Sequence, residues 1–287
     1  MYAQFDHLRP ASETELLETL GQIQGSYQIL GGGTDMIVDL RDGKLKTDHL
    51  IDVKRIEAFH AVTDEGDCIR IGCAVTLSQI AENPLVQQWA PALAQAVSKV
   101  GSVQIRNKGT LAGNIQTASP AGDGLNAAYA LDGTVVLLSA AGQRRVALQE
   151  YVCGPRRTLL ERGEVLAFVE LPKRTFTKEA FFKVGKRNAL AISVVNGVVA
   201  VDMNNGIIED ARVSVGAVAP TPLRITAAEE LLRGKALTPE LAEEAGRLVS
   251  QSVHPISDIR ASAEYRAYMA GTMVKRQLRS FLEEDAQ

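Results

Sequence analysis

The chain contains 287 residues, of which 46% are hydrophobic and 23% are charged, and its formal net charge is −3. This composition is typical of a globular protein large enough to bury a substantial core, and it gives no electrostatic reason to expect nucleic-acid binding. No apolar run reaches the roughly 20 residues needed to span a bilayer, and the N-terminus lacks a secretory signal, so we expect a soluble, cytoplasmic protein with no membrane span.

Metal-ligating side chains are sparse. The three cysteines (Cys68, Cys73 and Cys153) form no C-x-x-C pair, and they cannot by themselves supply the four thiolates that usually hold an iron–sulfur cluster. The histidines are scattered along the chain, so a histidine-based metal site is not expected. We predict no metal site, and any redox chemistry of this chain would therefore depend on an organic cofactor.

The first predicted elements are a helix and a short strand. Ser12 and Glu15 have the spacing of a capping box, and apolar residues follow at helical spacing from Leu16. An apolar run that ends at Leu30 predicts a strand. The elements expected after it are a strand at residues 49–53, a hairpin formed by residues 58–62 and 68–73, and helices at residues 76–80 and 86–100.

A glycine-rich stretch, Gly31-Gly32-Gly33-Thr34-Asp35, separates this first strand from an amphipathic turn at residues 36–40. Glycines at such a junction allow positive φ and a close approach of a ligand to the backbone, and the N–H groups that follow suit phosphate oxygens. The stretch has neither the G-x-G-x-x-G spacing nor the lysine of a P-loop. A site for an anion or dinucleotide and a plain strand-to-helix turn therefore both remain open on these residues alone.

A second glycine-rich stretch covers residues 105–124. It is rich in small and hydrogen-bonding residues and poor in large apolar ones. A loop of this composition is costly to order unless a ligand fills it. The residues after it predict a helix at 125–131 and strands at 134–139 and 144–148.

The rest of the chain is predicted to contain strands followed by helices. Asn204-Asn205-Gly206 joins the apolar segments 192–203 and 207–219, which is a strong signal for an antiparallel hairpin. The mixed order of strands and helices favours an α+β fold, and the polar run at residues 173–177 marks a candidate domain boundary. Other strands are predicted at residues 165–171 and 181–184, and helices at residues 227–232, 239–250 and 263–282.

Six motifs, in this order, resemble those of the FAD-binding (medium) subunit of the molybdenum hydroxylases, the family of xanthine dehydrogenase, aldehyde oxidase and aerobic carbon monoxide dehydrogenase. They are GGGTD at 31–35, QIRN at 104–107, TLAGN at 110–114 with ASPAGD at 118–123, GPRRT at 154–158, EVL at 164–166 and RASAEYR at 260–266. The resemblance runs nearly end to end, and within the family the chain looks most similar to the separate FAD subunits of bacterial xanthine dehydrogenases.

The resemblance implies an α+β fold with two domains. Residues 1–175 would form a PCMH-type FAD-binding domain, with a small lobe at about 1–55, a larger lobe at about 56–175, and FAD between the lobes. Residues 176–287 would form a smaller C-terminal domain of the CO dehydrogenase flavoprotein type, an antiparallel sheet with helices.

The site residues that the resemblance implies are all cofactor contacts. The first loop, which would surround the FAD pyrophosphate, consists of Leu30, Gly31, Gly32, Gly33, Thr34 and Asp35. The contacts to the phosphates and the ribityl chain would come from Thr110, Gly113, Asn114, Ser119 and Asp123. Leu166 would pack at the adenine end. Lys183 and Ile192 would lie beside the isoalloxazine ring with no acid–base role, and the Lys183 cation could stabilise charge on the reduced flavin.

The chain departs from the family pattern just before Ile192. The family often carries an aspartate at the preceding position, where this chain has Ala191, with Leu190 and Ala189 before it. Carboxylates that could tune the flavin potential or the binding of a nucleotide are therefore missing. The electron acceptor stays open among NAD, a quinone, oxygen and another protein.

The implied function is electron transfer within a larger complex. The subunit would take electrons from the [2Fe–2S] clusters of a partner subunit and pass them to an external acceptor. The substrate is expected to be a purine or another N-heterocycle, and it would be hydroxylated on a molybdopterin-binding large subunit. The whole complex is expected to be a dimer of heterotrimers. Two alternatives stay open on the sequence: a stand-alone FAD-dependent oxidase or reductase of related fold, and a non-redox nucleotide-binding protein.

Overall fold

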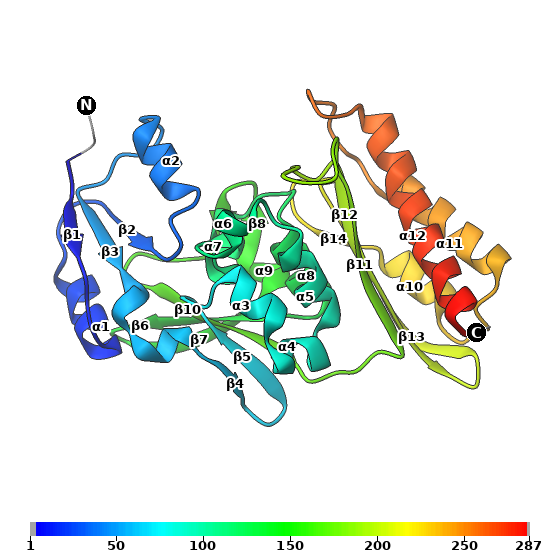
Figure 1. Ribbon diagram of the computed structural model, residues 1–287, viewed down its shortest axis with the longest axis horizontal. Coiled ribbons are helices and arrows are strands. Elements are labelled where there is room, and N and C mark those ends of the chain that lie inside the picture. The colour runs from blue at the N-terminus through cyan, green and yellow to red at the C-terminus, as the bar shows by residue number, and fades with distance from the viewer. Residues whose placement is uncertain (1–3, 286–287) are drawn as a thin grey trace.

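The computed structural model describes residues 4–285 and shows the expected mixture of helices and sheets. Figure 1 shows three regions side by side: a small N-terminal lobe, a central lobe, and a C-terminal region in which helices cover one face of a sheet. No helix among the described residues combines the length and the apolar character that crossing a bilayer requires.

The small lobe is built on a three-stranded parallel sheet with the order β1-β3-β2. Its helix α1 begins after Ser12, whose hydroxyl accepts a hydrogen bond from the N–H of Glu15 at 3.1 Å, as the capping pattern predicts. The prediction omitted β1, which is too short to give a periodic signal. The elements of this lobe are β1 (Asp6–Leu8), α1 (Glu13–Gln22), β2 (Tyr27–Leu30), α2 (Met36–Arg41) and β3 (His49–Asp52).

The central lobe contains a five-stranded antiparallel sheet with the order β4-β5-β10-β6-β7. Its strands are β4 (Val62–Asp64), β5 (Cys68–Gly72), β6 (Thr134–Ser139), β7 (Gly142–Ala147) and β10 (Val165–Pro172). The helices of this lobe are α3 (Leu77–Glu82), α4 (Pro84–Trp89), α5 (Pro91–Ser98), α6 (Val103–Arg106), α7 (Leu111–Thr117), α8 (Asp123–Ala130) and α9 (Leu148–Tyr151). A small hairpin, β8 (Val152–Gly154) and β9 (Arg157–Thr158), follows α9.

Three sequence predictions in this lobe are wrong in detail. The helix predicted at 86–100 is divided into α4 and α5 because Pro91 lacks an N–H and occupies the first turn of a new helix. The stretch predicted as a loop at 105–124 contains α7, which begins after Thr110. The hairpin predicted from residue 58 starts later, at β4, because residues 57–60 form a 3₁₀ turn.

The C-terminal region is an antiparallel sheet with the order β11-β12-β13-β14, covered by three helices. Its elements are β11 (Lys178–Val184), β12 (Val195–Asn204), β13 (Ile207–Gly216), β14 (Leu223–Arg224), α10 (Thr226–Leu232), α11 (Pro239–Ser252) and α12 (Ala263–Asp285). The hairpin predicted at 204–206 is confirmed: Asn205 and Gly206 have φ of 50° and 78°, as a tight hairpin turn requires. Residues 192–194, predicted as strand, precede β12.

The hydrophobic side chains form two separate cores. One core lies between the central sheet and its helices, and the other lies between the C-terminal sheet and α10–α12. The division between these cores falls near β11, whose Phe181 packs into the first core and Phe182 into the second. Neighbouring strand residues face opposite sides of the sheet, so β11 contributes to both cores. The domain boundary at 175/176 stays a prediction.

The two cores are joined by polar contacts between α5 and β11. Glu179 accepts a hydrogen bond from the N–H of Ala92 at 2.7 Å, and Gln95 accepts one from the N–H of Phe181 at 2.9 Å. Ala92 lies in the first turn of α5, and Ala90, the residue before that helix, provides no side-chain cap. A carboxyl group of the C-terminal sheet therefore caps a helix of the central lobe.

The titration of Glu179 gives a testable pH dependence. Burial raises the pKa of this carboxyl from 4.5 to about 7, and the hydrogen bond from Ala92 only partly offsets the effect. Because the folded-state pKa lies above the unfolded one, stability should fall as the pH rises from about 4.5 to about 7 and then level off. Glu179→Gln keeps an acceptor oxygen and cannot ionise. The difference in unfolding free energy between Glu179→Gln and wild type, measured by urea unfolding, should therefore shift in favour of the variant by about 1–3 kcal/mol as the pH rises from about 5 to about 8. Parallel pH profiles for the two proteins would contradict this prediction.

Candidate functional site

The first glycine loop follows β2 and lies directly against the second. A Cβ atom placed on Gly32 would be 2.0 Å from the carbonyl oxygen of Lys108 and 2.7 Å from the Cα of Gly109, so only glycine fits. Gly33 has a φ of +73°, which turns the chain back toward α2. No oxygen in the described part of the chain accepts a hydrogen bond from the N–H of Gly32, Gly33 or Thr34. These donors are available to a ligand.

The second loop is shaped by side-chain caps. The Thr110 hydroxyl accepts a hydrogen bond from the N–H of Gly113 at 3.0 Å and so starts α7. The side-chain oxygen of Asn114 accepts one from the N–H of Leu125 at 2.8 Å, which ties α7 to α8. The loop is thus held in place by its own hydrogen bonds.

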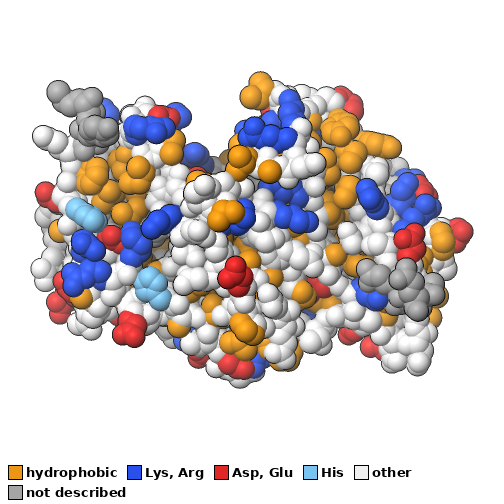
Figure 2. Space-filling model, viewed as in Figure 1, with side chains coloured by type: hydrophobic (Ala, Val, Ile, Leu, Met, Phe, Trp, Pro, Cys, Tyr) orange, Lys and Arg blue, Asp and Glu red, His pale blue; other side chains and the backbone are white. Residues whose placement is uncertain are grey.

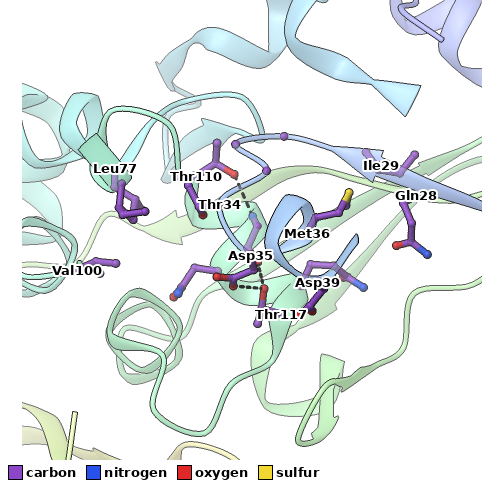
Figure 3. A pocket seen from close by; sticks show the side chains of 18 of the residues that line it. Gln28, Ile29, Thr34, Asp35, Met36, Asp39, Leu77, Val100, Thr110 and Thr117 are labelled. Carbon is purple, nitrogen blue, oxygen red and sulfur yellow. Dashed lines mark hydrogen bonds between the residues drawn. The ribbon is translucent and has the colours of Figure 1, made fainter. Parts of the chain in front are cut away.

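Among the contacts that join the small lobe to the central lobe, two lie beside the glycine loops. Thr117 donates a hydrogen bond to Asp35 at 3.1 Å, and Figure 3 shows these two side chains pointing toward one another. Arg156, in the turn between β8 and β9, forms an ion pair with Asp39 of α2 at 2.8 Å, and Asp39 raises the pKa of the guanidinium. Both contacts join segments that are far apart in the sequence, and both lie at the edge of the same cavity.

This cavity has a volume of about 380 Å³ and is lined by both glycine loops. Figure 2 shows the molecule hollowed between the small lobe and the rest of the chain, where the cavity lies. The predicted residues that line it are Gly31, Gly32, Gly33, Thr34, Asp35, Thr110, Gly113 and Asn114. The residues predicted in two segments about eighty positions apart therefore line the same cavity.

A smaller apolar cavity of about 70 Å³ adjoins it, and Gly31, Thr110 and Gly113 line both. Leu166 lines this second cavity together with Ile29, Val53 and Cys73. Burial raises the pKa of the Cys73 thiol, so this residue acts as a neutral, apolar wall. A cavity with free N–H donors beside an apolar one suits a ligand that carries an anionic group next to an apolar part.

Asp123 and Lys183 form an ion pair between the two cores. The carboxyl group of Asp123 is 5% exposed and accepts hydrogen bonds from Ser193 and Asn196, both at 2.6 Å, and from Lys183 at 2.5 Å. Lys183 also donates to the carbonyl of Lys99 at 2.9 Å. Asp123 is thus saturated by protein partners and fixes the position of the ammonium group of Lys183.

Lys183 lines a third cavity, of about 620 Å³, between α5, α12 and the segment that follows β11. The other charged residues that line this basic pocket are Lys99, Arg106, Arg187 and Arg276, and none of its described lining residues carries a carboxylate. Such a pocket attracts anionic or electron-rich groups.

Other predicted residues lie outside these cavities. Leu30 is buried behind the first loop, and the Ser119 hydroxyl accepts a hydrogen bond from the N–H of Ala121 at 3.3 Å. Ile192 is 57% exposed on the segment between β11 and β12. The cofactor roles of all predicted residues stay predictions.

Sequence reasoning missed the contacts that assemble the site. Asp39 and Arg156 lie 117 positions apart, and Asp123 and its partner Asn196 lie 73 apart. Arg156 stands in the GPRRT motif, which was the one available signal, but the motif does not identify its partner.

Comparisons with known proteins cover both halves of the chain. Residues 3–174 match the family described as the FAD binding domain in molybdopterin dehydrogenase, and residues 180–281 match the CO dehydrogenase flavoprotein C-terminal domain. The chain is 37% identical over 243 residues to the nicotinate dehydrogenase FAD-subunit of Eubacterium barkeri, and the alignment covers 83% of this chain and 82% of that protein. It is 31% identical over 252 residues to the xanthine dehydrogenase FAD-binding subunit of Escherichia coli O157:H7, and the alignment covers 87% of this chain and 86% of that protein.

Among solved structures, the chain is similar to one from the carbon monoxide dehydrogenase of Hydrogenophaga pseudoflava that lacks the Mo-pyranopterin moiety. The TM-score is 0.91, the sequence identity is 30%, and the alignment covers 97% of each chain.

Proposed function

Because this chain belongs to the family of FAD-binding subunits of molybdopterin dehydrogenases, we propose that it carries electrons from the [2Fe–2S] clusters of a partner subunit, through FAD, to an acceptor outside the complex. It is an oxidoreductase subunit, and its cofactor is FAD. Bound FAD supplies the chemistry of accepting electrons singly and releasing them as a pair.

The observation that carries the proposal is the arrangement of the two glycine loops. The two loops approach one another most closely at Gly32. Beside the apolar cavity, three adjacent N–H donors of the first loop have no acceptor among the described residues. These features suit the pyrophosphate and one ring of FAD. Gly31–Asp35 and Thr110–Asn114 would hold the phosphates and the ribityl chain, and Leu166 would contact the adenine.

The basic pocket would hold the isoalloxazine, the redox-active ring of FAD. Lys183 is fixed by Asp123, so its ammonium group presents a positive charge at a defined place. A fixed cation stabilises negative charge without reorganisation, which favours reduced flavin. Ile192 would flank the ring at the solvent side, and its exposure supports access by an external acceptor.

The partners and the substrate belong to the same proposal. Two of the relatives reported above are named as subunits of nicotinate and xanthine dehydrogenases, and nicotinate and xanthine are N-heterocycles, whereas the similar solved structure is of a carbon monoxide dehydrogenase. We extend this substrate class to the present complex, with hydroxylation on a molybdopterin-binding large subunit. We also propose that the complex is a dimer of heterotrimers and that it is located in the cytoplasm.

Reduction of the flavin by substrate tests this function. The complete complex should show bleaching of the flavin band when substrate is added without air, and omission of the iron–sulfur subunit should abolish the bleaching. Equal bleaching without that subunit would contradict electron transfer and would indicate a stand-alone flavin enzyme.

A further inference from the structure

Exposed apolar side chains gather on the segment before α12 and on its first turns. Ile256 and Ile259 are 75% and 90% exposed, and Tyr265 and Tyr268 are 47% and 64% exposed. Figure 2 shows hydrophobic atoms collected in this region, over the start of α12. We call Ile256, Ile259, Tyr265 and Tyr268 the apolar ridge.

The ridge continues toward the basic pocket. Lys186 donates a hydrogen bond to the carbonyl of Ile259 at 2.6 Å, which joins the segment before α12 to the segment between β11 and β12. The latter segment exposes Leu190 (53%), which also lines the basic pocket. Isolated exposed apolar residues are ordinary, whereas several on two joined segments indicate a binding surface.

The ridge is held rigidly by a buried arginine. Arg266 is 3% exposed and donates hydrogen bonds to the carbonyls of Val194 at 2.7 Å and Ala217 at 3.0 Å. It also forms an ion pair with Asp258 at 2.7 Å, and Asp258 accepts a further hydrogen bond from the N–H of Arg260 at 2.8 Å. The turn that presents Ile259 is therefore ordered before any partner arrives, which lowers the entropy lost on binding. This assigns a role to the RASAEYR motif, which the FAD site leaves unexplained.

The surroundings of the ridge carry positive charge. Lys186, Arg187 and Arg276 form no ion pair with any described carboxylate, and Arg187 and Arg276 line the basic pocket. Asp258 is neutralised by Arg260 and Arg266, and Glu264 is the one acidic side chain on the exposed first turn of α12. A complementary partner would present an apolar centre with acidic residues around it.

We propose that the apolar ridge and its basic surroundings are the docking surface for the iron–sulfur subunit. This inference rests on the proposed function, which requires electrons to enter from another chain. The surface borders the pocket of Lys183, so a partner seated on it lies next to the predicted flavin ring. A second copy of this chain fits poorly, because a two-fold contact through the ridge would bring two positively charged surfaces together.

The test measures subunit composition in the assembled complex. The chain carrying Ile259→Asp is expressed with both partner subunits, purified by a tag on this chain, and its iron–sulfur subunit is quantified against FAD. We expect the bound iron–sulfur subunit to fall at least about tenfold, as loss of a central hot-spot side chain would cause, with FAD content unchanged. The matched control is Ile207→Asp, which alters a 40% exposed isoleucine at the hairpin end of β13 and should leave the composition unchanged.

A second variant guards against a folding defect. Tyr268→Lys alters a side chain that is 64% exposed and should give the same loss. Wild-type amounts of iron–sulfur subunit in both variants, or loss of only the molybdopterin subunit, would overturn the docking surface. If the wild-type chain itself purified with FAD but without any iron–sulfur subunit, the proposed function would fail instead.

Discussion

Replacing Gly32 by alanine is expected to abolish tight FAD binding. The new Cβ atom would lie 2.0 Å from the carbonyl oxygen of Lys108 and 2.6 Å from its carbonyl carbon. These are backbone atoms, so no side-chain rotation relieves the overlap, and the two glycine loops must move apart. Because the loops form two sides of the same cavity, we expect the dissociation constant for FAD to rise at least about 100-fold.

The matched control for this change is Gly21→Ala. Gly21 lies in α1, and a Cβ atom there would meet nothing within 4 Å. Titration of the deflavinated proteins with FAD, followed by flavin fluorescence, compares the variants. Wild-type affinity in Gly32→Ala would show that FAD does not lie between the loops. Circular dichroism separates a local effect from loss of the fold.

Replacing Asp123 by alanine is expected to destabilise the chain itself. The carboxyl group is 5% exposed and is the acidic partner of Lys183, whose side chain is 12% exposed. Its removal also takes the acceptor from Ser193 and Asn196. Removing one partner of a buried ion pair leaves the other charge uncompensated, which costs about 3–5 kcal/mol. Urea unfolding of the FAD-free protein should show a loss of this size.

The double variant Asp123→Ala with Lys183→Met separates the charge effect from packing. It should recover part of the lost stability, because no unpaired ammonium group remains between the cores. Glu243→Ala is the control for an exposed pair, since Glu243 is 57% exposed beside Arg279, and it should cost less than about 1 kcal/mol. Equal losses in Asp123→Ala and Glu243→Ala would contradict a structural role for the buried pair.

Local signals in the sequence predicted much of the fold. Ser12 and the pair Asn205-Gly206 specify a helix start and a hairpin turn through their own backbone and side-chain geometry, and the structure confirms both. Errors arose where one residue overrides a longer pattern. Pro91 divides an apolar segment that otherwise has helical spacing, and Thr110 starts a helix inside a stretch that composition alone assigns to a loop.

The candidate site was predictable only in part. Glycine-rich loops are recognisable because close backbone approach limits the residues that fit, and both loops line one cavity. Side-chain partners are not encoded in this way. Asp123 meets Lys183 only because α8 and β11 pack together, and nothing in the residues around Asp123 indicates that contact. Arg156 and Asp39 likewise meet only because the small lobe packs against the central lobe.

We propose that this chain binds one FAD between its two glycine loops and supplies it to a complex with iron–sulfur clusters. The most direct measurement is the absorbance spectrum of the complex purified with its native partners, together with the amount of FAD released on denaturation. We expect a flavin spectrum with a broad iron–sulfur contribution and one FAD for each copy of this chain. A colourless preparation that takes up no added FAD would show that this chain is not a flavin subunit.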